Sequence, residues 1–251
     1  MSIVKEPMET IGIKNNFFEK TVIIIGGTSG IGREVAKEFK GRGARTFVAA
    51  RRLPQHKPFG EFIPCDVRRE GDVLDLVGKV ITRENKIDIL INSMAVNQCK
   101  PIEEISLSDW QDVIATNITG IFLSCRAVLP YMKQARSGKI VNISSIAGRH
   151  HSPVAGVHYV ASKAAIIGFS KQLAYEAAPF GINVNVLCPG QTMTPMLQKG
   201  MTQEQIKRLE LEIPLRRIAN VEDQVGPILF LCSHEASYLS GAVLDVNGGQ
   251  I

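Results

Sequence analysis

Residues 21–32, which read TVIIIGGTSGIG, decide the fold of this chain. A run of strand length, Thr21 to Ile25, leads directly into a glycine-rich turn. The residues that follow place Ile31, Val35 and Phe39 on one face of a helix. Glycines let such a turn bend tightly and approach a pyrophosphate, which the free N–H groups and dipole of the helix N-terminus attract. The stretch therefore predicts a strand–turn–helix unit that binds a dinucleotide, with a plain tight turn as the alternative.

The rest of the chain repeats this alternation of strand and helix. Further apolar runs of strand length occupy residues 46–50, 87–91, 139–144, 183–187 and 243–246. Between them, apolar residues recur at three- and four-residue steps, most clearly from Val73 to Ile81 and from Trp110 to Met132. We therefore predict an α/β protein with a single-domain Rossmann fold, a doubly wound parallel seven-stranded sheet with helices on both faces. The domain would span residues 17–251, behind a flexible arm at residues 1–16.

Bulk composition argues against several classes of protein. The formal net charge is +5, but the basic residues form doublets and no long stripe, so nucleic-acid binding is not expected. No uninterrupted apolar run approaches the roughly 18 residues of a membrane-spanning helix, and residues 1–16 lack a signal-peptide core. The five cysteines are scattered without CxxC spacing. They predict reduced thiols in a cytoplasmic protein, with neither a disulfide framework nor a metal site.

Polar residues and glycines follow the apolar runs at the positions where a ligand is expected. In doubly wound sheets, ligands bind in the crevice beyond the carboxyl ends of the strands. Those positions hold Gly26, Arg51, Asn92, Ser145 and the pair Pro189-Gly190. Their shared placement predicts one binding site at this edge of the sheet.

The residues after the second strand bear on the choice of cofactor. Dinucleotide sites usually place an acidic residue about 20 positions after the glycine turn, where it binds the ribose 2′-hydroxyl. Here Ala50 occupies that position and is followed by Arg51 and Arg52. A guanidinium binds a 2′-phosphate through charge-assisted hydrogen bonds, whereas a carboxylate would repel it. We therefore predict NADP(H) in preference to NAD(H); the alternative is that both arginines point into water.

Tyr159 and Lys163 are candidates for acid–base chemistry. Their spacing of four places them on one face of a helix, one turn apart. A free tyrosine has a pKa near 10, and a nearby ammonium would favour the phenolate and lower that pKa. Ser145 could donate a hydrogen bond to the same substrate oxygen, although a YxxxK match alone also fits a surface pair. Asn117, beside the apolar stripe of its helix, is either a satisfied core residue or part of a polar network.

Together these residues resemble the short-chain dehydrogenase/reductase family over essentially the whole chain, from Phe17 to Ile251. The resemblance rests on the glycine turn, Cys65-Asp66-Val67, Asn117, Ser145, Tyr159 with Lys163, and residues 189–194 and 241–249. It implies that Tyr159 is the general acid/base and that Ser145 polarises the substrate carbonyl. Lys163 would lower the pKa of Tyr159 and hold the nicotinamide ribose, and Asn117 would anchor a water in a proton relay.

The resemblance and the glycine turn together imply a set of cofactor-binding residues. They are Gly26, Thr28, Ser29, Gly30, Ile31, Gly32, Arg51, Arg52, Asp66, Val67, Asn92, Ser93, Tyr159, Lys163, Pro189, Gly190, Thr192 and Thr194. Asp66 and Val67 would flank the adenine, Asn92 would lie near a cofactor ribose, and the two threonines would contact the carboxamide and phosphates.

The chain departs from the family pattern in three places. Ile25 stands where the family usually has threonine, and residues 92–95 read Asn-Ser-Met-Ala where it has Asn-Asn-Ala-Gly. Because these two regions support each other in the family, local packing should differ here. Ser145 and Tyr159 are 14 positions apart, one more than usual, which predicts a longer loop over the substrate. Its adjacent histidines, His150 and His151, are expected to contact substrate or simply lie in the loop, since neighbours rarely chelate one metal.

The resemblance implies an enzyme that transfers a hydride between nicotinamide and a carbonyl or secondary alcohol. Residues 213–216, Ile-Pro-Leu-Arg, are similar to the 3-oxoacyl-acyl-carrier-protein reductase branch. In that branch basic residues near the pocket dock the carrier; Arg136 fits one such position, but Phe180 replaces another arginine. Alternatives are a dehydrogenase of sugars, polyols or cyclic alcohols and a non-catalytic dinucleotide-sensing protein. A sensor would be expected to lose part of the catalytic set.

Two further expectations concern the substrate and the assembly. Residues 193–212 are polar and helical in pattern, and by resemblance they form a substrate lid with Gly200 as a hinge. The long apolar helix and the small residues Ala161, Ala164, Ala165 and Gly168 predict close packing against a second subunit. We expect a homotetramer or homodimer that acts on a small-molecule substrate.

Overall fold

The computed structural model describes residues 17–199 and 201–251. The arm at residues 1–16 and the hinge residue Gly200 therefore lie outside the described residues. Seven strands form one parallel sheet in the order β3-β2-β1-β4-β5-β6-β7, as predicted. The strands are β1 Thr21–Ile25, β2 Arg45–Ala50, β3 Glu61–Pro64, β4 Ile89–Asn92, β5 Gly138–Ile143, β6 Ile182–Pro189 and β7 Val243–Val246.

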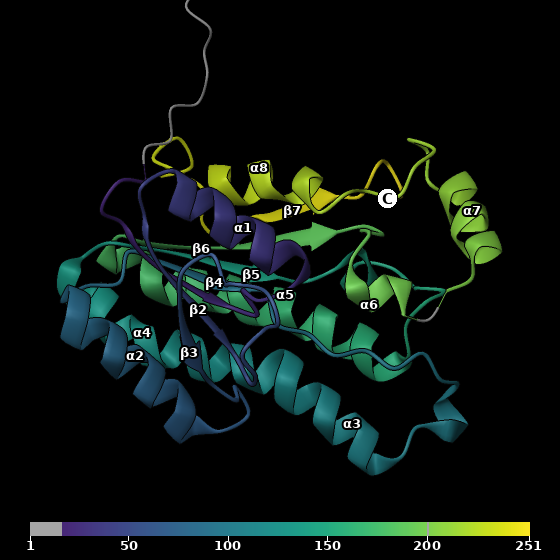
Figure 1. Cartoon of the computed structure of the whole chain (residues 1–251), viewed down its shortest axis with the longest axis horizontal. Helices are drawn as coiled ribbons and strands as arrows, with labels where there is room; N and C mark the ends of the chain where they lie inside the picture. The colour runs from purple at the N-terminus through teal and green to yellow at the C-terminus, as the bar shows by residue number, and fades with distance from the viewer. Residues whose placement is uncertain (1–16, 200) are drawn as a thin grey trace, which may run out of the picture.

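Eight α-helices are described around the sheet. They are α1 Gly30–Gly41, α2 Glu70–Glu84, α3 Leu107–Ile114, α4 Gly120–Ala135, α5 Val157–Ala177, α6 Pro195–Gln198, α7 Gln203–Glu212 and α8 Glu222–Cys232. In Figure 1, α1 and α8 cover one face of the sheet, whereas α2, α4 and α5 cover the other. Helices on both faces confirm the doubly wound arrangement.

Each face of the sheet has its own apolar layer. Side chains of successive strand residues point to opposite faces. Ile23 accordingly belongs to the core beneath α2, α4 and α5, whereas Val22 and Ile24 belong to the core beneath α1 and α8. All five residues of β1 are buried, because helices cover both faces of this central strand. The apolar run that predicted β1 is thus a strand enclosed on both sides.

The long helix expected from Trp110 to Met132 is interrupted. α3 and α4 form one continuous helical segment joined by a π-helical turn at Ala115–Thr119. The extra residue in this turn rotates one part of the apolar stripe relative to the other. Trp110 and Phe122, which the helical pattern placed in the buried stripe, are therefore 39% and 42% exposed.

The same segment is the one membrane-span candidate in the described part of the chain. By length and composition, Leu107–Ala135 would suffice to cross a bilayer, with a mean hydropathy of 1.5. However, half of its most apolar window is buried inside the domain, as in the core helix of a globular fold.

The sheet topology places a crevice beside β1. β1 pairs with β2 on one side and with β4 on the other. The segments that follow the carboxyl ends of β1 and β4 therefore run in opposite directions. Loops that diverge in this way leave a gap beyond the carboxyl ends of the strands, where doubly wound proteins bind ligands. The crevice is thus fixed by strand order.

Candidate active site

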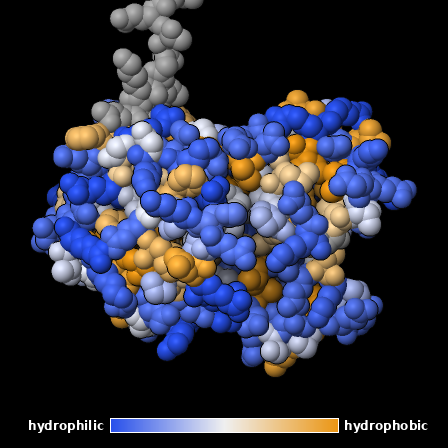
Figure 2. Space-filling view, viewed as in Figure 1, coloured by the Kyte–Doolittle hydropathy of each residue, from blue (hydrophilic) through white to orange (hydrophobic). Residues whose placement is uncertain are grey.

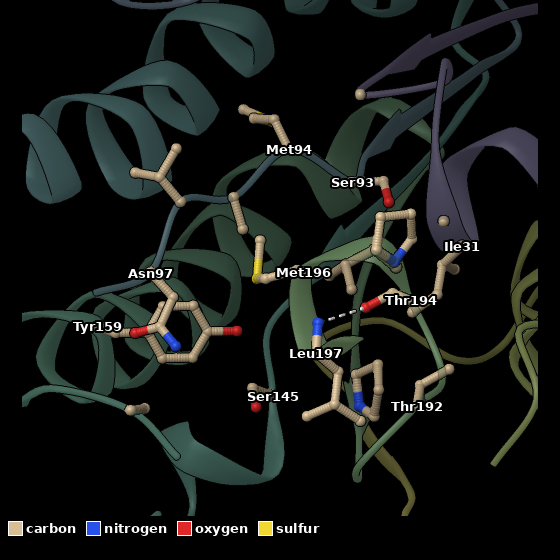
Figure 3. A pocket seen from close by; sticks show the side chains of 18 of the residues that line it. Ile31, Ser93, Met94, Asn97, Ser145, Tyr159, Thr192, Thr194, Met196 and Leu197 are labelled. Carbon is tan, nitrogen blue, oxygen red and sulfur yellow. Dashed lines mark hydrogen bonds between the residues drawn. The ribbon is translucent and has the colours of Figure 1, made fainter. Parts of the chain in front are cut away.

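A cleft of about 900 Å³ opens at the carboxyl ends of the strands (Figure 3). Its volume lies within the roughly 300–1,000 Å³ typical of small-molecule sites. The predicted site residues that line it are Gly26, Thr28, Ser29, Gly30, Ile31, Arg51, Asp66, Val67, Ser93, Ser145, Tyr159, Lys163, Pro189, Gly190, Thr192 and Thr194. Those that lie outside its lining are Gly32, Arg52, Asn92 and Asn117.

The glycines of the turn stand where side chains would press against neighbouring atoms. Gly26 has a φ of +80°, and a Cβ there would lie 2.8 Å from the backbone nitrogen of Met94. Gly30 opens α1 and faces Thr194 across the cleft, with 3.3 Å between its ideal Cβ and the threonine Cγ2. In the described part of the chain, the side chain of Ser29, the N-cap residue of α1, accepts no hydrogen bond from the helix. The first N–H groups of α1 therefore remain available to a ligand. These features fit a pyrophosphate.

Gly32 serves packing, since a Cβ there would lie 2.4 Å from the carbonyl oxygen of Gly26. It permits α1 to approach the turn closely, although it does not line the cleft.

One end of the cleft carries Arg51 and Asp66. Arg68 binds both carboxylate oxygens of Asp66, with Nε 2.9 Å from Oδ1 and Nη2 2.6 Å from Oδ2. These hydrogen bonds hold the pKa of the Asp66 carboxyl below its usual range, and the charge of Arg51 acts in the same direction. Arg51 lines the cleft, whereas Arg52 is exposed outside it. Of the two arginines, Arg51 is therefore the one placed to contact a ligand.

The hydroxyl groups of Ser145 and Tyr159 face the interior of the cleft (Figure 3). Ser145 follows β5, and its side chain is oriented by the backbone N–H of Ala147, 3.1 Å from Oγ. Tyr159 and Lys163 lie one turn apart on α5, as predicted. Lys163 is 2% exposed, and its Nζ donates to the carbonyl oxygen of Ile143 at 2.8 Å. That ammonium lies 5.5 Å from the centre of the Tyr159 ring.

Burial dominates the protonation of both α5 residues. It raises the pKa of Tyr159 to about 12, while hydrogen bonding with Ser145 acts in the opposite direction. Burial also lowers the pKa of Lys163 to about 8. Burial has the largest effect on the pKa of Tyr159, and the lowering of that pKa by Lys163 stays a prediction. At neutral pH the phenol keeps its proton.

Relatives identify the family of this site. A family model described as enoyl-(acyl carrier protein) reductase matches residues 26–250. The chain is 36% identical to a 3-oxoacyl-acyl-carrier-protein reductase of Chlamydia pneumoniae, over 92% of this chain and 96% of the relative. The chain belongs to the short-chain dehydrogenase/reductase family.

Two further proteins support this assignment. The chain is 31% identical to an acetoacetyl-CoA reductase of Acinetobacter, over 92% of this chain and 97% of the relative. Its structure superposes with a TM-score of 0.88 on ligand-free aldohexose dehydrogenase of Thermoplasma acidophilum, at 29% identity, covering 94% of this chain and 95% of that one. As a member of the short-chain dehydrogenase/reductase family, the protein is an oxidoreductase that uses a nicotinamide cofactor on a carbonyl or alcohol carbon.

In this short-chain dehydrogenase/reductase, the side chain of Asn117 belongs to a buried polar network. Asn117 lies in the π-helical turn and is fully buried. Its Oδ1 accepts from the backbone N–H of Val96 at 2.8 Å. Its Nδ2 donates to the carbonyl oxygen of Val96 and to Oγ of Ser162, both at 3.0 Å. The amide thus ties the loop after β4 to α5.

Asn92 also belongs to the interior. Its Nδ2 donates to Oδ1 of Asn142 at 2.8 Å, and its Oδ1 accepts from Oγ of Ser124 at 2.8 Å. Both bonds join β4 to neighbouring elements beneath the cleft. The Asn92 side chain is thus held in the interior, outside the lining of the cleft, and its place near a cofactor ribose stays a prediction.

The departures from the family pattern are accommodated by apolar packing. Ile25 and Met94 are 2% and 8% exposed. A Cβ on Gly120 would lie 2.8 Å from Cγ2 of Val67 and 3.3 Å from Cε of Met94. Met94 therefore fills the space where α4 approaches the loop after β3.

Two histidines and one arginine that the sequence singled out lie away from the cleft lining. The exposed rings of His150 and His151 are 4.1 Å apart. Among the described residues, no group of three or more His, Cys, Asp or Glu is placed to hold a metal ion.

Arg136 caps α4 and donates to the carbonyl oxygen of Pro179 at 3.0 Å, near the amino end of β5. It lies at the opposite edge of the sheet from the cleft of its own subunit, which corrects the expectation that it lies near the pocket.

Sequence reasoning missed several residues that line the cleft. Ser144 directly precedes Ser145 and donates to the carbonyl oxygen of Lys163 at 2.7 Å. Asn97 lies in the loop after β4, so the strand-end rule could have found it. Residues 193–199 and 201–212 contribute an apolar set that their polar composition concealed: Met196, Leu197, Met201 and Leu209. Figure 2 shows apolar side chains gathered around α6 and α7 on the molecular surface.

Proposed function

We propose that the protein is an NADPH-dependent reductase of 3-oxoacyl thioesters. The observation that carries this proposal is that Ser145 and Tyr159 direct their hydroxyls into one cleft with the glycine turn and Arg51. Apolar lid side chains line the same cleft and suit an acyl chain. The relatives named as 3-oxoacyl and acetoacetyl-CoA reductases support this substrate class.

The side chains suit reduction of a ketone. A bound nicotinamide would supply the hydride. Tyr159, which burial keeps protonated, donates its proton to the oxygen of the reacting carbonyl, since an alkoxide is far more basic than a phenolate. Ser145 donates a hydrogen bond to the same oxygen and stabilises its developing negative charge. Lys163 has three N–H donors, so it can bind ribose hydroxyls while it remains bonded to Ile143.

The choice of NADPH rests on Arg51. It follows β2 at the position of the usual ribose-binding carboxylate and lines the cleft. A guanidinium there pairs with a 2′-phosphate.

The test is oxidation of NADPH in the presence of acetoacetyl-CoA, with NADH as the control cofactor. We expect turnover with NADPH and a loss of about 100- to 10,000-fold in kcat on the Tyr159→Phe change, which removes only the hydroxyl. Circular dichroism and NADPH binding should stay unchanged in the variant. Unchanged turnover in Tyr159→Phe would exclude the mechanism, and inertness of the wild type would exclude the substrate class.

A second candidate is oxidation of a sugar, polyol or cyclic alcohol. The amide side chain of Gln191 in the cleft favours a hydroxylated substrate. The aldohexose dehydrogenase of similar fold is named for one. The same enzyme preparation, assayed with aldohexoses and either NADP⁺ or NAD⁺, distinguishes this candidate from the first.

We also propose a cytoplasmic homotetramer or homodimer. The five cysteines are all free thiols, which suits a reducing compartment. Exposed apolar side chains on α4 and α5, including Phe122, Val157 and Tyr175, offer a face for a second subunit. Light scattering should give a multiple of the 27.5 kDa chain mass, and a monomeric mass would refute the assembly.

A further inference from the structure

Two segments that line the cleft are joined directly to each other. One is the loop after β4, which contributes Asn97, and the other is the segment 152–155 between Ser145 and Tyr159. Asn97 Nδ2 donates to the carbonyl oxygen of Val154 at 2.9 Å. One residue after Asn97 and two residues after Val154, the backbone N–H of Gly156 donates to the carbonyl oxygen of Gln98 at 3.2 Å. Only the first of these bonds depends on a side chain.

The loop that carries Asn97 is itself fixed from behind. Asn117 binds both backbone polar groups of Val96, the residue before Asn97, and it also donates to Ser162 on α5. The hydrogen bonds therefore form a closed ring that runs from α5 through Asn117 to the loop after β4. It returns through Asn97 and Val154 to the start of α5, where Tyr159 lies.

Apart from its bond to Asn97, the segment is tied to other parts of the chain by the Gly156 backbone bond and by the ion pair of Arg149 with Asp245. Residues 149–156 have no regular helix or strand between the short helical turn that ends at Gly148 and α5. This stretch lies between Ser145 and Tyr159, which are 14 positions apart. Longer irregular segments have more conformations available, so an anchoring bond matters more there.

Asn97 makes this bond at a cost to the fold. Its Oδ1 is buried and has no partner among the described residues. A buried carbonyl oxygen without a donor destabilises the folded state, and an apolar side chain of similar size would avoid that penalty. An amide at this position is therefore better explained by what its N–H groups hold than by stability.

We propose that Asn97 is a positioning residue that determines substrate selectivity by fixing residues 152–155 as one wall of the substrate end of the cleft. This inference rests on the proposed reductase function for its choice of substrate. Loss of the bond lets the wall withdraw, so small substrates are held less well against Tyr159. Bulkier substrates are affected less, because they fill the widened cleft.

The test compares Asn97→Asp, which keeps the shape but removes the N–H donor, with Asn97→Leu, which also removes the unpaired oxygen. Lys100→Ala is the matched control, since Lys100 is exposed in the same loop and lies outside the cleft lining. We expect both Asn97 variants to lower kcat/KM for acetoacetyl-CoA about tenfold, as loss of one well-placed hydrogen bond would, with a smaller loss for a longer 3-oxoacyl-CoA. The dissociation constant for NADPH should stay unchanged in all three variants.

Two readouts separate positioning from a structural role. Hydrogen–deuterium exchange should become faster in residues 152–156 of both Asn97 variants, with α1 unaffected. The melting temperature of Asn97→Leu should equal or exceed that of the wild type. Unchanged exchange in residues 152–156, or a fall in melting temperature that parallels the loss of activity, would overturn the proposal. If the wild type is inert with acyl thioesters, the proposed substrate fails, and exchange together with turnover of cyclic ketones decides the role of Asn97.

Discussion

Lys163 is a lysine that the fold encloses almost completely. Its side chain is 2% exposed and has a backbone carbonyl as its hydrogen-bond partner, so burial lowers its pKa from 10.5 to about 8. An enclosed ammonium lowers the free energy of unfolding, since the charge loses its hydration. The burial of Lys163, a residue of the candidate active site, therefore destabilises the folded state.

This conflict predicts a pH dependence of stability. Below pH 8, Lys163 is charged in both states; from about pH 8 to 10.5 the folded lysine is neutral while the unfolded one keeps its proton. The unfolded state then binds more protons, so stability rises with pH in that window. Relative to Lys163→Met, the wild type should gain about 2 kcal/mol in free energy of unfolding between about pH 7.5 and 9.5. Urea unfolding without cofactor measures this difference, and parallel pH profiles for the two proteins would contradict it.

How far single residues could be predicted depended on the range of their contacts. Tyr159 and Lys163 are coupled through one helical turn, so spacing alone revealed the pair. The roles of Asn92 and Asn97 depend on partners 50 and 57 positions away. No local pattern carries that information.

At the scale of elements, the helical segment from α3 to α4 shows how close packing constrains the chain. Gly120 starts α4, and a Cβ there would lie 2.8 Å from Cγ2 of Val67. Gly78, inside α2, has no described atom within 4 Å of its ideal Cβ beyond its own helix backbone. A Cβ can therefore be added at Gly78 without a close contact, whereas at Gly120 it would press against Val67.

Replacing each of these glycines with alanine tests that difference. Gly120→Ala should lower the free energy of unfolding by about 1–3 kcal/mol, because overpacking forces α4 away from Val67. Gly78→Ala should raise it by about 0.5–1 kcal/mol, because alanine favours the helix. Urea unfolding of both variants gives the two values. Equal effects of the two substitutions would show that packing at Gly120 is not limiting.

Elements enclosed by helices were the easiest to predict. β1 has five buried residues in succession, so its apolar run was unambiguous. β3 was not recognised as an apolar run, because only Ile63 of its four residues is buried. The π-helical turn at Ala115–Thr119 was missed, since it depends on how Asn117 bonds to a distant loop.

At the scale of the whole molecule, ligand binding and folding are linked through the cleft. The cleft takes residues from both halves of the sheet, so a bound dinucleotide stabilises the folded state as a unit. NADPH at about 100 times its dissociation constant should add about 2.7 kcal/mol, which raises the melting temperature by about 5–10 °C.

Arg51 makes this shift selective. NADH at the same concentration should raise the melting temperature less, and Arg51→Ala should remove most of the difference between the two cofactors. Arg52→Ala is the matched control, because Arg52 lies outside the cleft lining. Scanning fluorimetry measures the shift of each of the three proteins with each cofactor, and equal shifts with NADPH and NADH in the wild type would reject the preference.

The position of β1 between β2 and β4 also matters for how such a protein can diversify. Arg51 and Asp66, which we propose to contact the dinucleotide, follow strands on one side of β1. Asn97 and the cleft-lining residues of α6 and α7, which we propose to face the substrate, follow strands on the other side. A duplicated gene, or a designer, can therefore alter one set without disturbing the other. The cofactor preference and the substrate preference of a single domain can therefore change independently of each other.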